Sequence, residues 1–338
     1  MGRYVGALNL QPAHQTFVIF NMANKITIQL FTSFHIPAVV DLQSAYSKSY
    51  PEAPIIPGEV YLSPAFEGNV FCAIDESGKI VGYAPLYPVL MRDDSNLPHT
   101  LWAEIKAHPD ASRDAPNEIK DQLLKRILLR AREVTGEFSG HPIHLTFQYF
   151  PSETASVAYV ISKGCQHMES VFTMRRDLVR EIPSPQAMEG IAIRPWRMES
   201  EAEQQEYVDA RNECFPETPV ELGEWQYFMQ SPQWSVGTTF AAFHGDKLVG
   251  NVAVFWDEAE NQKSGNQTGF TEYIFVRPKW RGKNIARNLV NVGLAYLKQH
   301  GLADAHLEVR AKNEGALRLY VDLGFEVLRE SRFYVLKL

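Results

Sequence analysis

The alternation of hydrophobic and polar residues divides the chain into short strands and amphipathic helices. Apolar residues recur at every second position in the strand-like runs and at every third or fourth position in the helix-like runs. Strands are predicted at residues 26–31, 69–75, 80–87, 101–109, 143–150, 191–196, 238–243, 247–255 and 271–276. Helices are predicted at residues 35–50, 118–134, 153–163, 200–214 and 221–230, with Gly164 as a candidate C-cap of the third.

This order of elements occurs twice, so the sequence predicts an α+β protein of two tandem units. Three pairs of segments align: Phe71–Gly82 with Phe240–Gly250, Ala107–Pro109 with Val276–Pro278, and Lys163–Gly164 with Leu323–Gly324. The segment 181–190 holds two prolines and predicts a linker between a domain at 22–180 and a domain at 191–338. Residues 1–21 are interpreted as an extension, with Met22 as a candidate natural start.

Composition narrows the class of protein. The chain has 338 residues, 45% hydrophobic and 22% charged, which is typical of a globular protein of about two domains. A net charge of −7 argues against nucleic-acid binding, and no apolar run reaches the roughly 18 residues that span a bilayer. Three widely spaced cysteines, Cys72, Cys165 and Cys214, show no metal-ligand spacing and favour a reducing, cytoplasmic location. We therefore expect no metal, no membrane and no nucleic acid.

A basic turn near the C-terminus predicts an anion site. The strand 271–276 runs into Arg277–Pro278, and a glycine-containing turn with Arg281, Lys283 and Arg287 leads into a helix. Backbone N–H groups of such a turn, with a helix N-terminus behind them, bind anions. Because proteins hold pyrophosphates in this way, a nucleotide-containing cofactor is the first hypothesis.

The turn and the segments after it resemble the GNAT superfamily of N-acetyltransferases. Arg281-Gly-Lys-Asn-Ile-Ala286 fits the family's loop, except that Asn284 stands where the central glycine belongs. Asn tolerates a positive φ better than most residues, so the turn can persist. Leu307–Asn313 and Ala316–Phe325 are similar to ribosomal-protein N-terminal acetyltransferases, and the tandem layout is similar to mycothiol synthase. The resemblance implies two GNAT folds, each a mixed, mostly antiparallel sheet flanked by helices.

The resemblance also implies acetyl-CoA as co-substrate and direct acetyl transfer to a primary amine. An alkyl ammonium, with a pKa of about 10, must lose a proton before it attacks, and the departing thiolate leaves more easily when an acid protonates it. Tyr320 matches the family's acid; packing in the core is its alternative role. Glu308 and Glu272 are both candidates for the base, and the sequence does not choose between them. An ion pair with Arg310 is the alternative for Glu308, and a strand-edge charge is the alternative for Glu272.

Cofactor contacts are implied for two segments and one further residue. The backbone of Ile274, Phe275 and Val276 is expected to face the pantetheine arm and the thioester oxygen. The pyrophosphate is expected at Arg281, Gly282, Lys283, Asn284, Ile285, Ala286 and Arg287. Asn313 is expected to bind the cofactor arm, and it is also a candidate helix N-cap.

The first copy lacks the corresponding features. Its loop, Ala111–Pro116, has no glycine and contains a proline, which removes an N–H donor. Val160 stands in the place of Tyr320, and alignment sets Ala103 against Glu272 and Thr146 against Glu308. We interpret the first domain as degenerate, with a structural or substrate-positioning role.

Other readings stay open at this point. The acceptor is a small-molecule amine or a peptide N-terminus, and the protein is a monomer or a homodimer. A non-catalytic acyl-CoA-binding regulatory protein is the alternative to an enzyme, and a longer acyl donor is an alternative within enzymes. Trp225, Tyr227 and Phe228 either pack in the core or line a substrate pocket, and packing is the favoured interpretation.

Overall fold

The computed structural model describes residues 26–88, 98–111, 117–136 and 142–338, and the first half contributes seven strands and three α-helices within them. The strands are β1 (Thr27–Leu30), β2 (Val70–Ile74), β3 (Ile80–Pro88), β4 (His99–Ala103), β5 (Lys106–Ala107), β6 (Ile143–Tyr149) and β7 (Gln166–Asp177). The helices are α1 (Ile36–Ser49), α2 (Glu118–Thr135) and α3 (Thr154–Ser162), and short 3-10 turns cover Ser33–His35, Gly58–Leu62 and Pro64–Phe66.

The second half repeats this order with a longer set of helices. Its strands are β8 (Ile191–Pro195), β9 (Thr238–His244), β10 (Lys247–Trp256), β11 (Thr268–Val276), β12 (Asp304–Arg310) and β13 (Glu326–Lys337). Its helices are α4 (Glu201–Cys214), α5 (Leu222–Phe228), α6 (Pro232–Val236), α7 (Glu258–Ser264), α8 (Ile285–Gln299) and α9 (Glu314–Asp322), with a 3-10 turn at Pro278–Trp280. The helix α7 is an element that the hydrophobic pattern did not predict.

Helices cover both faces of a mostly antiparallel sheet, so the predicted α+β class is confirmed. In the second half, Phe240 and Ala242 of β9 face a core with α8 and α9, whereas Ala241 and Phe243 face a core with α4 and α5. Alternate side chains of a strand point to opposite faces, which explains why these strands are apolar throughout. The first half is built in the same way, with α2 and α3 on one face and α1 on the other.

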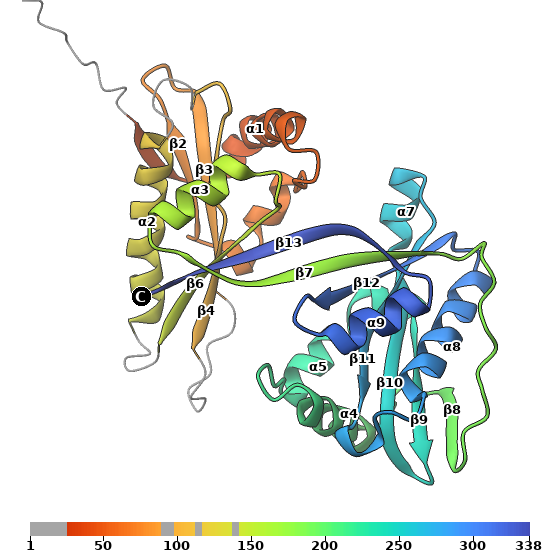
Figure 1. Ribbon diagram of the computed structural model, residues 1–338. Helices are drawn as coiled ribbons and strands as arrows, with labels where there is room; N and C mark the ends of the chain where they lie inside the picture. The colour runs from red at the N-terminus through yellow and green to blue at the C-terminus, as the bar shows by residue number, and fades with distance from the viewer. Residues whose placement is uncertain (1–25, 89–97, 112–116, 137–141) are drawn as a thin grey trace, which may run out of the picture.

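The two halves share one sheet, because each lends its last strand to the other. The strand order is β1-β2-β3-β4-β6-β13-β7-β12-β11-β10-β9-β8. The strand β7 pairs with β12 of the second half, and β13 pairs with β6 of the first. Figure 1 shows β7 and β13 running side by side between the two lobes, with the C-terminus against the first lobe. The sequence repeat did not reveal this exchange.

The structure supports the predicted repeat at two equivalent glycines. Gly82 pairs with Ala107, and Gly250 pairs with Val276. A Cβ added at Gly82 would lie 2.7 Å from Ile119 of α2, and one at Gly250 would lie 3.1 Å from Leu289 of α8. Both glycines therefore let a helix pack closely on the sheet. Gly164 and Gly324, which follow α3 and α9, have φ angles of 90° and 83°, as expected after a helix end.

Some sequence predictions fall outside the described residues. These are the extension 1–21 with Met22, most of the loop at 92–99, and residues 112–116 of the first-copy turn. The strand predicted at 101–109 is divided into β4 and β5, with Glu104 and Ile105 between them. Both pieces pair with β3, β4 near its end and β5 near its start.

Candidate active site

A β-bulge in β11 opens the sheet of the second half. Asn251 pairs with Phe275 and Ala253 pairs with Glu272, so two residues, Tyr273 and Ile274, oppose one residue of β10. Tyr273 has a φ of 51°, and its ring packs 5.1 Å from that of Phe228. The strands β11 and β12 pair only from Thr268 to Phe270 and then diverge. Beyond that point the β12 side of β11 has no strand partner, which leaves backbone groups available to a ligand.

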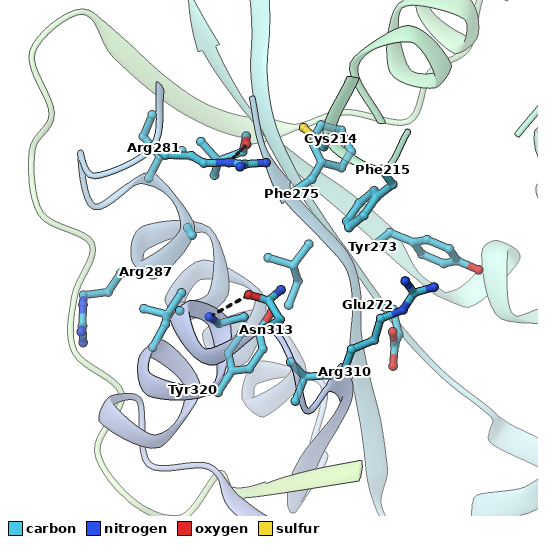
Figure 2. Close-up of a pocket in the computed structure, with 18 of the residues that line it drawn as sticks. Cys214, Phe215, Glu272, Tyr273, Phe275, Arg281, Arg287, Arg310, Asn313 and Tyr320 are labelled. Carbon is cyan, nitrogen blue, oxygen red and sulfur yellow. Dashed lines mark hydrogen bonds between the residues drawn. The ribbon is translucent and has the colours of Figure 1, made fainter. Parts of the chain in front are cut away.

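A cavity of about 1250 Å³ lies where the strands diverge. It is lined by parts of β11 and β12, the turn before α8, the start of α9 and the loop after α4. Figure 2 shows Arg281 and Cys214 at one end, Glu272 and Arg310 at the other, and Asn313 and Tyr320 between them. Thirteen of the fourteen residues singled out from the sequence line this cavity, and Lys283 does not. The Nζ of Lys283 instead lies 4.7 Å from the centroid of the Trp280 ring.

The turn before α8 has the backbone shape of an anion site. Gly282 and Asn284 have φ angles of 76° and 60°, so Asn284 takes the conformation that the family's glycine would supply. The N–H of Asn288 bonds to the Asn284 carbonyl as the first bond of the helix. The earlier N–H groups of the helix have no acceptor within it. Together with the helix dipole, these donors favour a negatively charged ligand.

Two arginines of the turn are placed differently. The Nε of Arg281 donates to the carbonyl of Val276 at 3.1 Å, which ties the turn to the end of β11. Arg287 forms an ion pair with Asp322 at 3.0 Å, and in Figure 2 its side chain points away from the other labelled residues. Arg281 therefore contributes more directly to the cavity's charge than Arg287 does.

Asn313 and Tyr320 line the cavity from the same helix, with Asn313 at the start of α9 and Tyr320 in its last turn. The Oδ1 of Asn313 accepts from the N–H of Ala316 at 3.2 Å, so Asn313 is the N-cap of α9 (Figure 2). Its amide nitrogen remains available as a donor. Tyr320 is 6% exposed and packs against Phe325 with ring centroids 5.9 Å apart. Burial and the nearby Glu272 carboxylate raise the pKa of Tyr320, which keeps its phenol protonated at neutral pH.

Glu272 and Glu308 lie near each other in the cavity, and they differ in their exposure to solvent. Burial, with a smaller contribution from the charge of Glu308, raises the pKa of Glu272 to about 8. The backbone N–H of Glu308 partly offsets that rise. Glu308 is exposed at the mouth, and its Oε1 accepts from the hydroxyl of Thr173 at 3.4 Å. The exposed Glu308 therefore gives the mouth a carboxylate that favours a cation, whereas Glu272 holds a proton up to about pH 8.

Several cavity residues were not singled out from the sequence. Arg310 bridges Glu169 of β7 at 3.3 Å and Glu217 of the loop after α4 at 3.5 Å, and Lys312 reaches Glu217 at 3.4 Å. These ion pairs fix the loop after α4 over the mouth. Arg310 and Lys312 lie within the recognised signature Leu307–Asn313, but their partners Glu169 and Glu217 are far away in sequence. Trp225 is buried and its ring packs 5.1 Å from that of Phe228, as the packing interpretation predicted for both. The same interpretation was wrong for Tyr227, which is 80% exposed. None of the three residues lines the cavity.

The first half has a carboxylate at the position of Glu272, and the sequence match to Ala103 was wrong. The pairs Gly82–Ala107 and Gly250–Val276 are equivalent. Three residues further along, the N–H of Glu104 bonds to the Pro85 carbonyl at 3.2 Å, as Glu272 pairs with Ala253. The register of the first half contains no extra residue here, so the bulge shifts the match by one. Glu104 forms an ion pair with the buried Lys106 at 2.7 Å.

The match of Thr146 with Glu308 was also wrong, because Gln148 occupies that position. Glu308 pairs with Thr173 of β7, and Gln148 pairs with Phe333 of β13. The pairs Thr173–Arg329 and Glu169–Phe333 relate the two exchanged strands in the same way. The register error arose because the sequence alignment rested on one leucine, Leu145, rather than on the helix that follows.

Side chains fill the space between diverging strands in the first half. Glu153, the N-cap of α3, takes the place of Asn313. Its carboxylate accepts from the hydroxyl of Tyr46 at 2.7 Å and from the N–H of Phe150 at 2.8 Å. The hydroxyl of Tyr149 donates to the Ile105 carbonyl at 3.5 Å across the same gap. These bonds satisfy groups that a cofactor arm would otherwise need to reach.

The part of the chain that the structure describes was predicted to hold no metal and to cross no membrane. No group of three or more His, Cys, Asp or Glu side chains is arranged there to hold a metal ion. None of the helices in this part of the chain combines the length and hydropathy needed to cross a bilayer.

Comparison with known proteins places the site in a family. The sequence model of the acetyltransferase (GNAT) family matches residues 199–325, which include the cavity and the turn before α8. Residues 199–325 therefore match the GNAT family of acetyltransferases, as the sequence predicted, and this match supports the prediction of an acetyltransferase enzyme.

Particular relatives support the tandem arrangement. The chain is 30% identical over 169 residues to a mycothiol acetyltransferase of Thermobispora bispora, covering 48% of this chain and about half, 55%, of that relative. It is 25% identical over 278 residues to one of Actinosynnema mirum, covering 81% and 86%. Among solved structures, a GCN5-related N-acetyltransferase of Sphaerobacter thermophilus has a TM-score of 0.74 at 17% identity, covering 92% and 95%. A tandem GNAT protein of the clavulanic acid biosynthesis pathway has a TM-score of 0.64 at 16% identity, covering 93% and 98%.

Proposed function

We propose that the protein transfers an acetyl group from acetyl-CoA to a primary amine in the cavity of the second half. The observation that carries this proposal is the placement of Glu272, with its raised pKa, beside the protonated Tyr320 at the point where the strands diverge. A base and an acid on opposite sides of one cleft are what the transfer needs. A protein that only bound acyl-CoA would need neither.

The cavity fits acetyl-CoA in its backbone and its charge. The N–H groups of the turn 282–287 would hold the pyrophosphate, with Arg281 beside them. The unpaired side of β11 at Ile274–Val276 would bind the pantetheine arm by backbone hydrogen bonds, and the amide of Asn313 would add a donor. Acetyl-CoA supplies the activated acetyl group as a thioester.

Three residues of the cavity, Glu308, Glu272 and Tyr320, have separate roles in binding the amine and moving protons. We assign Glu308 to binding of the incoming ammonium, because it is exposed at the mouth. Glu272 takes the proton that the amine loses, since a pKa of about 8 suits a base that works near neutral pH. As the amine nitrogen bonds to the acetyl carbon and the carbon–sulfur bond breaks, Tyr320 gives its proton to the departing sulfur. The second proton that the nitrogen loses restores the phenol of Tyr320.

The acceptor class follows from the charge of the site. The exposed carboxylate of Glu308 at the mouth favours a cationic amine, either a small molecule or a peptide N-terminus. Relatives named mycothiol acetyltransferase make a small amine-bearing thiol conjugate one candidate for testing.

The test is release of the CoA thiol from acetyl-CoA with a panel of polyamines, aminoglycosides, amino-sugar conjugates and peptides. We expect amine-dependent release that Tyr320→Phe reduces mainly in kcat. Titration calorimetry should give one acetyl-CoA per chain, and Arg281→Glu should weaken that binding. Binding without thiol release for every amine would support an acyl-CoA-binding regulatory protein instead. A stoichiometry of two would show that the first half also binds the cofactor.

A further inference from the structure

A short hydrogen-bonded row crosses three strands at the mouth of the cavity. The Nε of Arg329, on β13, donates to the hydroxyl oxygen of Thr173 on β7 at 3.3 Å. The hydroxyl of Thr173 in turn donates to the Oε1 of Glu308 on β12 at 3.4 Å. Thr173 pairs in register with both neighbours, so the row is fixed by the sheet. Because β7 comes from the first half, the row exists only through the strand exchange.

The direction of these bonds is determined by chemistry. An arginine Nε–H can only donate, so the oxygen of Thr173 must accept from it. The single proton of the Thr173 hydroxyl is then free for Glu308, which receives it as an acceptor. Thr173 is 5% exposed, which limits the other orientations its side chain can take. The row therefore holds one oxygen of Glu308 and leaves the other oxygen available at the mouth.

Arg329 is itself held in place. Its guanidinium carbon lies 5.7 Å from the centroid of the Phe150 ring, a cation–π contact. Among the residues that the structure describes, no carboxylate lies within ion-pair distance of Arg329. The guanidinium of Arg329 therefore acts on the row through its hydrogen bond to Thr173.

The equivalent position in the first half has no such row. Phe333 occupies the position equivalent to Thr173, and it pairs with Gln148, which occupies the position equivalent to Glu308. Glu169 occupies the place of Arg329 and pairs with Arg310. Phe333 has no hydroxyl, so it cannot accept one hydrogen bond and donate another as Thr173 does. The row is thus present on the side of the sheet that has the cavity and absent from the related side, where side chains fill the gap.

We propose that Thr173 and Arg329 are positioning residues of the acceptor site, which orient Glu308 to bind the ammonium of the acceptor. This rests on the proposed function of the second half, and it gives the first half a defined part in substrate binding. The loss of one hydrogen bond to a charged group weakens binding roughly tenfold or more. The two bonds here are long, at 3.3 and 3.4 Å, so we expect an effect of about tenfold or less.

The test compares Thr173→Val with Thr173→Ser in the full-length protein, using the most active amine from the thiol-release panel. Valine keeps the shape and removes the hydroxyl, and serine keeps the hydroxyl. We expect Thr173→Val to raise the KM for the amine about fivefold to tenfold with kcat, acetyl-CoA affinity and Tm nearly unchanged. Thr173→Ser should stay within about twofold of wild type, and Arg329→Met should raise the amine KM about threefold.

The outcomes separate this inference from the function on which it rests. An unchanged amine KM in Thr173→Val, together with a raised KM in Glu308→Gln, would overturn the positioning role and leave the acetyltransferase proposal intact. Equal losses in Thr173→Val and Thr173→Ser, with a lowered Tm, would show a packing role instead. No amine-dependent activity in the wild type would overturn the proposed function itself, and with it the role of Glu308.

Discussion

The two halves of the protein carry the same strand opening, and they differ in what occupies it. In the second half, Glu272 lines an open cavity next to Tyr320. In the first half, the equivalent Glu104 is neutralised by the buried ammonium of Lys106, and Val160 stands in for Tyr320. The carboxylate alone therefore does not make a site. An unpaired carboxylate, an acid opposite it and an unfilled gap between strands are needed together.

The same comparison shows why the first half is retained in the fold. It closes its own gap with Tyr46, Tyr149 and Glu153, yet its last strand completes the sheet beside Glu308. Its strand β7 also supplies Thr173 and Glu169 to the mouth of the cavity. This supports the proposal that the second half carries the chemistry and the first half supports it, although both are built from the same unit.

The largest expected effect comes from separating the halves. A fragment of residues 185–338 lacks β7, so β12 would become an unprotected edge and β13 would lose both of its neighbours. We expect this fragment to be insoluble or unfolded by circular dichroism. Co-expression with residues 1–184, which contain β7, should restore a complex that binds acetyl-CoA. A fragment 185–338 that melts cooperatively and binds acetyl-CoA alone would show that the exchange is dispensable.

The next largest effect is expected at Glu272. Glu272→Gln removes the proposed base and should lower kcat by about 10² to 10⁴. In the wild type, kcat/KM should rise as pH increases through about 8, because the carboxylate must be unprotonated to accept a proton. Glu308→Gln removes a like charge and lowers the pKa of Glu272, so the rise should move to lower pH. A pH profile that is the same in wild type and Glu308→Gln would contradict the coupling.

The same residue gives a prediction for stability. The folded state raises the pKa of Glu272 from its usual 4.5 to about 8, so between these values the folded protein holds a proton that the unfolded chain has released. Stability should therefore fall as pH rises through this window. Glu272→Gln should remove that fall, and its Tm should exceed the wild-type Tm increasingly from pH 5 to pH 8. A constant difference in Tm across this range would rule out the titration of Glu272 as the cause.

In the first half, the ion pair of Glu104 and Lys106 should matter for stability and not for chemistry. Lys106→Met leaves a carboxylate without its partner and should lower the free energy of unfolding by about 3 kcal/mol. The double variant Glu104→Gln with Lys106→Met should recover most of that loss, because no charge is left unpaired. Urea denaturation measures both variants. Equal losses in the single and double variants would show that the packing of Lys106, rather than its charge, is what counts.

The smallest effect is expected at Asn284. Its φ of 60° is the conformation that glycine adopts without strain, so Asn284→Gly should change stability by no more than about 1 kcal/mol. The affinity for acetyl-CoA should stay within about threefold, because the N–H donors of the turn keep their places. Asn284→Val is the control, since a β-branched residue disfavours this φ and should weaken binding clearly. Equal affinities in all three proteins would remove the turn from the proposed cofactor site.

The sequence by itself determined the repeat, the fold class and the turn at 281–287, because these depend on local periodicity and on residues close together in the chain. Gly282 and Asn284 sit where a positive φ is required, and Asn313 sits where a helix begins. The signature from Leu307 to Phe325 was recognisable for the same reason. Each of these features is decided within a few residues, so no knowledge of distant contacts was needed.

Only the tertiary structure decided which carboxylates correspond and which strands meet. A single bulged residue at Tyr273 shifts the match of Glu272 from Ala103 to Glu104, and no local pattern marks that insertion. The exchange of β7 and β13 brings Thr173 to Glu308 and to Arg329 across sequence separations of 135 and 156 residues. Strand pairing is a choice among many similar apolar strands, and it is settled by the packing of the whole sheet. The mouth of the site is therefore a property of the assembled fold, whereas the turn behind it is already present in the sequence.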